Sequence, residues 1–224
     1  MEMELLKTEH LFSYPDHSIA WEHLCRFEYP WDALDSLKEF ILALGPTLPS
    51  DIYECRGEGV YVAKSAKIAP TAFIGGPTII CPDAEIRHGA FIRSSAIVGS
   101  GAVVGNSVEL KNCILFDGVQ VPHFNYVGDS VLGYKSHMGA GSVTSNVKSD
   151  KTPVAIRFGE ERVNTGRKKL GAILSDFVEV GCNSVLNPGT VIGTSSNVYP
   201  LSSVRGYVPE HSIFKSQDTV VEKR

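Results

Sequence analysis

The chain has 224 residues, a net charge of −4 and a hydrophobic content of 43%, a balance typical of a folded domain. The mild acidity gives no electrostatic support for binding nucleic acid, and no apolar run approaches the roughly 20 residues that span a bilayer. The five cysteines are scattered without a Cys-x-x-Cys pair, so reduced thiols and a cytoplasmic location are predicted.

Residues 1–58 form the first predicted part, a small helical arm or cap. The stretch "WDALDSLKEFILALGP" repeats apolar residues at helical spacing, and Gly45-Pro46 ends the pattern. The apolar positions are Leu34, Leu37, Ile41 and Leu44. "AWEHLCRF" is a shorter helix candidate, and the aromatic residues of this part are predicted to pack rather than to bind a ligand.

A six-residue period begins near Val62 and predicts a mainly-β chain. Large aliphatic residues recur every six positions, with a small residue two positions before most of them. Two residues apart on a strand means the same face, so each hexapeptide predicts a short strand with one large and one small inward side chain. Three such strands close a coil of about 18 residues, and stacked coils form a parallel β-helix over residues 59–208. In such a coil Tyr126 should lie directly above Thr144.

The large apolar positions fall into two runs: Val62, Ile68, Ile74, Ile80, Ile86, Ile92, Val98, Val104, Leu110 and then Phe116, followed by Leu174, Val180, Leu186, Ile192, Val198 and Val204.

Residues 147–169 separate the two runs and are polar, basic and out of register. A long insert of this kind predicts a functional or mobile loop. Its basic residues are interpreted either as a solvated loop or as partners of substrate phosphates; they are Arg157, Arg162, Arg167, Lys168 and Lys169. Residues 209–224 are predicted to form a tail that caps the last coil.

The period falters within "VPHFNYVGDSVLGYKSHMGAGSVTSN", residues 121–146, where Pro122 and His123 stand near the next aliphatic position. Stacked coils present flat faces, so chemistry must lie at corners, under loops or between subunits. A coil whose turns carry His, Tyr and Asn is therefore the candidate site.

Three segments, "VELKN", "PHFNYVGDS" and "GAGSVTSN", resemble the acetyltransferase half of the bacterial bifunctional N-acetylglucosamine-1-phosphate uridyltransferase/glucosamine-1-phosphate acetyltransferase. The whole chain, with "FEYPWDAL", is also similar to stand-alone proteins labelled UDP-N-acetylglucosamine pyrophosphorylase-like. The resemblance implies a left-handed hexapeptide-repeat β-helix that assembles as a homotrimer. It implies an acetyl-CoA-dependent N-acetyltransferase, which needs no metal. The implied acceptor is an aminosugar phosphate like glucosamine-1-phosphate, a precursor for nucleotide sugars and the cell envelope.

The resemblance also implies residue roles. His123 corresponds to the general base, for which histidine is suited because its ordinary pKa lies near neutrality. Asn146 corresponds to a catalytic residue that positions the reacting groups. The residues implied for the sugar phosphate are Lys111, Tyr126, Arg93 and His137, and those beside acetyl-CoA are Gly139, Ala140 and Cys182.

The chain departs from the family pattern at three places. Ser95 stands where a second phosphate-binding arginine is expected, and His137 replaces an asparagine before Gly-Ala-Gly. "VKSDK" follows Asn146, so that Lys148 or Lys151 would have to replace a phosphate-binding lysine. These changes predict retained chemistry with a different acceptor.

Two other functions are compatible with the sequence. The first is a non-catalytic scaffold that binds a sugar nucleotide. The second is a metal-dependent hydratase of the γ-carbonic-anhydrase type, whose zinc is held by three histidines at subunit interfaces. Its His-x4-His spacing is absent, and His88, His123 and His137 have no spacing typical of metal ligands. Taken alone, His123 would be interpreted as a turn histidine bonded to a backbone carbonyl.

Overall fold

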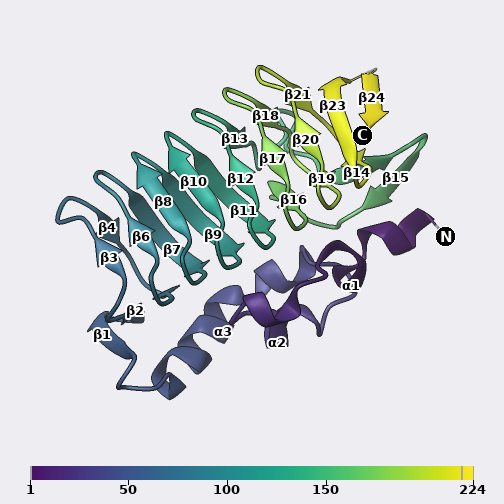
Figure 1. The fold of residues 1–224 in the computed structure, drawn as a ribbon. Helices are drawn as coiled ribbons and strands as arrows, with labels where there is room; N and C mark the ends of the chain where they lie inside the picture. The colour runs from purple at the N-terminus through teal and green to yellow at the C-terminus, as the bar shows by residue number, and fades with distance from the viewer. Residues whose placement is uncertain (1, 218, 224) are drawn as a thin grey trace.

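The computed structural model describes residues 2–217 and 219–223 and shows a parallel β-helix with a helical segment along one side (Figure 1). Each coil contributes strands to three faces, and its inward side chains fill the core with alternating large and small residues. The predicted mainly-β fold, β-helix and short N-terminal helical segment are confirmed.

The first face is a nine-stranded sheet. Its strands are β3 (Lys67–Ile68), β6 (Glu85–Ile86), β8 (Val103–Asn106), β10 (Gln120–His123), β12 (His137–Met138), β17 (Glu179–Val180), β20 (Asn197–Val198) and β23 (Ser212–Ser216), with β24 (Thr219–Glu222) antiparallel to β23. The tail thus adds a strand to this face before β24 closes it.

The second and third faces belong to one 13-stranded sheet, because three long strands turn the corner between them. The long strands are β7 (Phe91–Val98), β9 (Glu109–Leu115) and β11 (Tyr126–Leu132). The second face also holds β4 (Phe73–Ile74), β13 (Val143–Thr144), β18 (Val185–Leu186) and β21 (Ser203–Val204). The third face also holds β2 (Val60–Ala63), β5 (Thr78–Ile80), β16 (Ala172–Leu174), β19 (Thr190–Ile192) and β22 (Tyr207–Val208), with β1 (Tyr53–Gly57) antiparallel to β2.

The length of a coil changes along the β-helix. Ile86 pairs with Val104, 18 residues on, whereas Leu110 pairs with Val127, 17 residues on. The change occurs in β7, where the pairing with β9 shifts between Ile92 and Ser94 and leaves Arg93 between the two registers. The expected stacking of Tyr126 on Thr144 is therefore wrong: Tyr126 pairs with Val143.

The N-terminal helical segment consists of short helices that follow the third face along the axis of the β-helix (Figure 1). They are η1 (Glu2–Leu6), α1 (Thr8–Leu11), η2 (Pro15–His17), α2 (Trp21–Leu24), η3 (Asp32–Asp35), α3 (Leu37–Leu44) and η4 (Gly45–Thr47). The helices expected at "AWEHLCRF" and at "WDALDSLKEFILALGP" are confirmed, and the second ends at Gly45 as predicted.

This segment docks because the third face is apolar on its outer side as well. In six of its strands the middle residue points away from the core, yet it is fully buried; these residues are Ile79, Ile97, Ile114, Val131, Ile173 and Val191. Phe12 stacks on Phe116 with ring centroids 5.0 Å apart. The backbone N–H of Asp117 donates to the carbonyl of His17 at 2.9 Å. The arm therefore covers a face that would otherwise expose a continuous apolar stripe.

Asp176 gives this docking a dependence on pH. Its carboxylate accepts the backbone N–H groups of Ser13 at 2.7 Å and Tyr134 at 2.8 Å. Burial nevertheless raises the pKa of Asp176 above its ordinary value, and these hydrogen bonds oppose the shift only in part. A carboxyl group with a raised folded-state pKa stabilises the fold below its unfolded pKa, and this contribution is lost as pH rises through the folded pKa.

We therefore expect the melting temperature of the unmodified protein, minus that of Asp176→Asn, to increase as pH falls from about 7 to about 4. Thermal unfolding followed by circular dichroism at each pH measures this difference. Asp16→Asn, at an exposed position of the same arm, is the control and should give a smaller pH dependence. If this difference in melting temperature decreases as pH falls, the raised pKa of Asp176 is contradicted.

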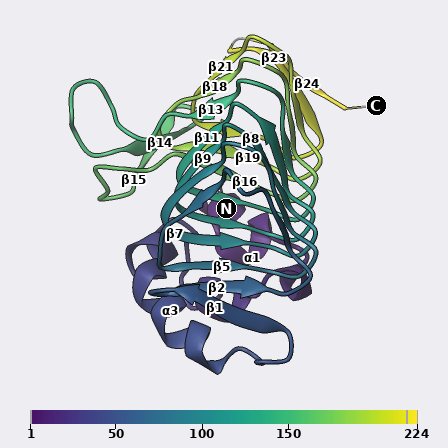
Figure 2. The ribbon, with the colours of Figure 1, turned by 90° about the vertical axis from the view of Figure 1, so that its left-hand side faces the viewer.

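The insert is not structureless. Its strands β14 (Ala155–Phe158) and β15 (Glu161–Asn164) form an antiparallel hairpin that projects from the side of the β-helix (Figure 2). Val154 and Ile156 are buried, and Phe158 stacks on Tyr207 at 4.6 Å, so the hairpin packs against the last coils. The apolar residues at every second position explain the strand, which the polar composition of the insert obscured.

Candidate functional site

Most of the predicted site residues lie at two corners on either side of the second face. The first corner joins the first and second faces, and the second corner joins the second and third faces. Backbone hydrogen bonds stack each corner on the corner of the next coil, so residues far apart in sequence come into line.

The first corner brings together His123, Gly139, Ala140 and Cys182. The N–H of Gly141 donates to the carbonyl of His123 at 3.0 Å, and the N–H of Asn183 donates to the carbonyl of Ala140 at 2.8 Å. His123 and Cys182 are exposed. Gly139 has no room for a side chain, because a Cβ atom there would lie 2.7 Å from the backbone nitrogen of Cys182. The implied base and the implied acetyl-CoA residues therefore form one vertical row.

Asn125, which sequence reasoning missed, holds this row in place. It is buried; its Oδ1 accepts the N–H of His123 at 3.1 Å, and its Nδ2 donates to the carbonyl of Gly139 at 2.9 Å. Between them Phe124 has a φ of 52°, which lets the chain turn sharply after His123. The histidine backbone is thus tied to the Gly-Ala-Gly turn of the next coil.

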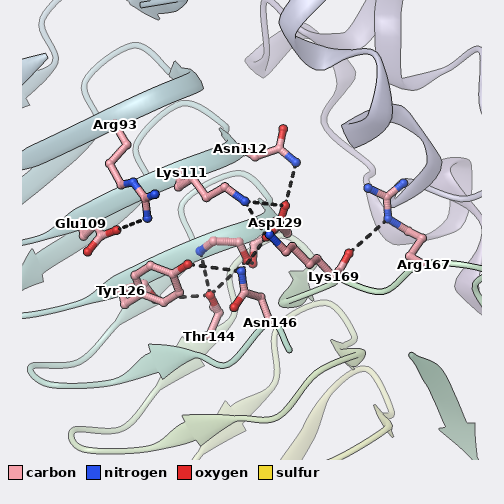
Figure 3. A network of polar contacts seen from close by, with 12 residues as sticks. Arg93, Glu109, Lys111, Asn112, Tyr126, Asp129, Thr144, Asn146, Arg167 and Lys169 are labelled. Carbon is pink, nitrogen blue, oxygen red and sulfur yellow. Dashed lines mark hydrogen bonds and ion pairs between the residues drawn. The ribbon is translucent and has the colours of Figure 1, made fainter. Parts of the chain in front are cut away.

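The second corner gathers Lys111, Tyr126 and Asn146 around Asp129 (Figure 3). The carboxylate of Asp129, whose side chain is only 4% exposed, accepts Asn146 Nδ2 at 2.6 Å and pairs with Lys111 Nζ at 3.3 Å. Asn112 Nδ2 donates to the same carboxylate at 2.8 Å. Asp129 and Asn112 were both missed from the sequence.

A shortened turn creates this arrangement. Leu110 and Leu115 are the inward aliphatic residues on either side of the second corner, and they are five residues apart rather than six; Val127 and Leu132 repeat this spacing. Asn112 and Asp129 each take a φ of 49°, a left-handed conformation that Asn and Asp tolerate better than most residues. The five-residue step was a signal in the sequence that could have located Asp129.

Tyr126 stays protonated in this environment. Burial raises the pKa of Tyr126, and the carboxylates of Asp129 and Glu109 raise it further. Its hydroxyl oxygen accepts Asn146 Nδ2 at 3.2 Å, so the phenolic proton remains available to donate to a ligand. Arg93 lies beyond Tyr126 and pairs with Glu109 at 2.9 Å on an exposed part of the same face.

His137 belongs to neither corner. It lies on the first face, where its Nδ1 is 2.7 Å from Glu179 Oε2 of the following coil. A carboxylate on one imidazole nitrogen orients the ring and leaves the other nitrogen for a substrate. Within the described part of the chain, neither His123 nor His137 makes a side-chain hydrogen bond to the Asp129 cluster.

Among residues 2–217 and 219–223, no three side chains of His, Cys, Asp or Glu are grouped as metal ligands would be. A zinc held between subunits, as in the hydratase alternative, would need residues from more than one chain. No helix in that part of the chain combines the length and apolarity needed to cross a membrane.

Known proteins are similar in sequence to this chain over part of their length. The bifunctional sugar-1-phosphate nucleotidylyltransferase/acetyltransferase of Sulfurisphaera tokodaii is 36% identical over 109 residues, which cover 49% of this chain and 27% of that protein. The bifunctional protein GlmU of Methanococcus vannielii is 29% identical over 154 residues, which cover 68% and 34%. The chain thus spans about a third or less of these relatives, and the predicted resemblance to such bifunctional proteins is confirmed.

Solved structures give weaker similarity. A mutant of AntD, an N-acyltransferase from Bacillus cereus in complex with dTDP and coenzyme A, aligns with a TM-score of 0.31 and 17% identity over 75% of this chain and 83% of that one. The acetyltransferase domain of PglB from Neisseria gonorrhoeae in complex with acetyl coenzyme A aligns with a TM-score of 0.28 and 14% identity over 72% and 56%. Scores this low carry no functional conclusion.

The family model for the GMPPB C-terminal domain matches residues 74–208, more than half of the sequence and most of the β-helix. The chain belongs to the GMPPB C-terminal domain family.

Proposed function

We propose that this protein is an acetyl-CoA-dependent N-acetyltransferase whose acceptor is an aminosugar phosphate of the glucosamine-1-phosphate type. The observation that carries the proposal is the row at the first corner, where exposed His123 stands one coil from Gly139 and Ala140 and two coils from Cys182. The name of the Sulfurisphaera tokodaii relative, which includes acetyltransferase, agrees with it. Such a protein would work in the cytoplasm, in the synthesis of nucleotide-sugar and cell-envelope precursors.

In the proposed reaction the acceptor amine attacks the thioester carbonyl. The new C–N bond forms as the C–S bond breaks, His123 takes the proton of the amine, and the imidazolium returns it to the departing coenzyme A thiolate. The narrow turn at Gly139 and Ala140 would let the thioester approach the main chain. Asn146, held by Asp129 and Tyr126, would position the acceptor.

On the second face, the cationic side chains predicted to bind the acceptor's phosphate are already paired with carboxylates. Lys111 is already paired with Asp129, and Arg93 with Glu109. Each ammonium or guanidinium must therefore share its charge with a carboxylate, which favours a weakly held or differently placed phosphate. This agrees with the expectation of a different acceptor.

The proposed assembly is a homotrimer in which a neighbouring chain completes the site. Phe73 and Phe91 support a subunit contact on the second face. Their side chains are 57% and 43% exposed, and their ring centroids lie 5.4 Å apart. An exposed aromatic pair of this kind is more often covered by a partner than left in water.

The proposal predicts two measurements. Acetyl-CoA at about 100 times its dissociation constant should stabilise the folded protein by about 2.7 kcal/mol, seen as a rise in melting temperature. A panel of aminosugar phosphates and free aminosugars should then release coenzyme A thiol, detected with a thiol reagent, for at least one acceptor. If acetyl-CoA does not bind and no acceptor releases thiol, the enzyme is contradicted and the non-catalytic sugar-nucleotide scaffold is favoured.

A further inference from the structure

A cavity of about 430 Å³ lies where the N-terminal segment, the second corner and the end of the insert meet. The charged residues that line it are Asp35, Lys38, Asp129, Arg167, Lys168 and Lys169. The volume is within the range of small-molecule sites. The cavity lies behind the second corner, toward the helices, and Arg93 and Tyr126 on the second face do not line it.

The charges of the cavity favour an anion. Four cationic side chains line it against the two carboxylates of Asp35 and Asp129. Both carboxylates are occupied: Asp129 by Lys111, Asn112 and Asn146, and Asp35 by Arg167. Within residues 2–217 and 219–223, no carboxylate lies within ion-pair distance of the ammonium groups of the other three lining cations, which are Lys38, Lys168 and Lys169.

Arg167 shows that the wall of the cavity is built rather than loose. Its side chain is only 9% exposed although it belongs to a polar insert. Nη1 forms an ion pair with Asp35 Oδ2 at 2.7 Å, so the guanidinium is held in place behind the lysines. Nε donates to the carbonyl of Lys169 at 3.4 Å, so the segment that carries Lys168 and Lys169 folds back along the guanidinium.

The same stretch is fastened to the Asp129 cluster. The N–H of Leu170 donates to the carbonyl of Asn146 at 3.0 Å, and the N–H of Gly171 donates to the carbonyl of Asp129 at 2.8 Å. Figure 3 shows Arg167 and Lys169 between this corner and the helices. These hydrogen bonds hold the backbone of Lys168 and Lys169 in place, so less backbone entropy is lost when a ligand binds.

We propose that this cavity binds the phosphoryl group of a small phosphorylated molecule, held by Lys38, Lys168 and Lys169, with Arg167 behind them. Several cations around one cavity suit a phosphate dianion or a diphosphate better than a carboxylate, which carries one charge. Three sources of this chemistry are distinguishable: a sugar phosphate, the diphosphate of a nucleotide, and the phosphates of coenzyme A. The proposal concerns binding and does not require acetyl transfer.

Isothermal titration calorimetry with the full chain tests the proposal. The probes are inorganic pyrophosphate, UDP, glucosamine-1-phosphate and coenzyme A, each titrated alone. We expect pyrophosphate and at least one organic phosphate to bind. The double variant K168A/K169A should weaken this binding about 10- to 100-fold, because two charge-assisted contacts are lost. The organic probe that loses affinity in the variant identifies the source of the phosphoryl group.

Two controls keep the test specific. Lys64→Ala removes an exposed lysine outside the cavity, whose ammonium donates to the carbonyl of Ser50 at 2.8 Å, and should leave the affinity unchanged. Lys38→Ala removes a cation from the opposite wall and should weaken binding without touching the insert. The proposal is overturned if no probe binds, if K168A/K169A binds normally, or if affinity is lost only when Arg93 or Lys111 is replaced. Phosphate binding without thiol release would refute the proposed function and leave this site standing.

Discussion

Replacing His123 with alanine is expected to lower the rate of acetyl transfer by about 10²- to 10⁴-fold, the usual contribution of a positioned general base. The side chain is exposed and makes no hydrogen bond among the described residues, so its removal should change the melting temperature little. Steady-state thiol release with the acceptor found in the panel measures the rate, and light scattering checks that the assembly is unchanged.

His88→Ala is the matched control. His88 occupies the same corner two coils earlier and is exposed like His123; among the described residues, its ring hydrogen-bonds only to Thr71 of the preceding coil, at 2.7 Å. The His88→Ala variant should retain full activity. If His123→Ala is also fully active, the base lies elsewhere, and His137, whose ring is held by Glu179, becomes the next candidate.

Asp129→Ala is expected to cost about 3 kcal/mol of stability, because it leaves Lys111, Asn112 and Asn146 without their shared acceptor. The stability lost is smaller than for a fully buried ion pair, because the Lys111 side chain is 24% exposed and can be partly rehydrated. The φ of 49° at position 129 adds to the loss, since alanine tolerates this conformation poorly. Urea-induced unfolding at one protein concentration measures the change.

Glu109→Gln gives the comparison. Glu109 pairs with Arg93 at 2.9 Å on an exposed part of the second face, where an ion pair typically contributes under about 1 kcal/mol. If the two substitutions cost the same, Asp129 does not organise the corner as described. Asp129→Asn keeps the backbone preference but presents an amide to three donors, so its stability should fall between those of the other two variants.

The repeat was readable from the sequence because it depends on local chemistry. Inward residues such as Ile86 and Val104 recur with the period of the coil, and each one reports its own position without help from distant parts of the chain. The short arm helices were readable for the same reason, since Leu34, Leu37 and Ile41 mark a buried stripe. The GMPPB C-terminal domain match over residues 74–208 agrees with this region.

The candidate site was only partly readable, because it depends on contacts between coils. The motifs singled out Lys111, Tyr126 and Asn146, and the structure places them together. Asp129 escaped notice because the second corner is one residue shorter, in its coil and in the preceding one, than the expected six-residue period; Leu115 and not the expected Phe116 therefore takes the inward position. Asp35 and Arg167 are far apart in the sequence, and no local pattern relates them.

The arm along the third face restricts how this protein can change in evolution. A bare β-helix gains or loses whole coils easily, since each coil contacts only its neighbours. Here the arm packs Gly45 against Tyr61 in the first coil and reaches as far as Asp176, so it spans several coils. One inserted coil would displace its anchors by about 4.8 Å. The length of the arm therefore fixes the number of coils beneath it, and that number can change only if the arm changes length as well.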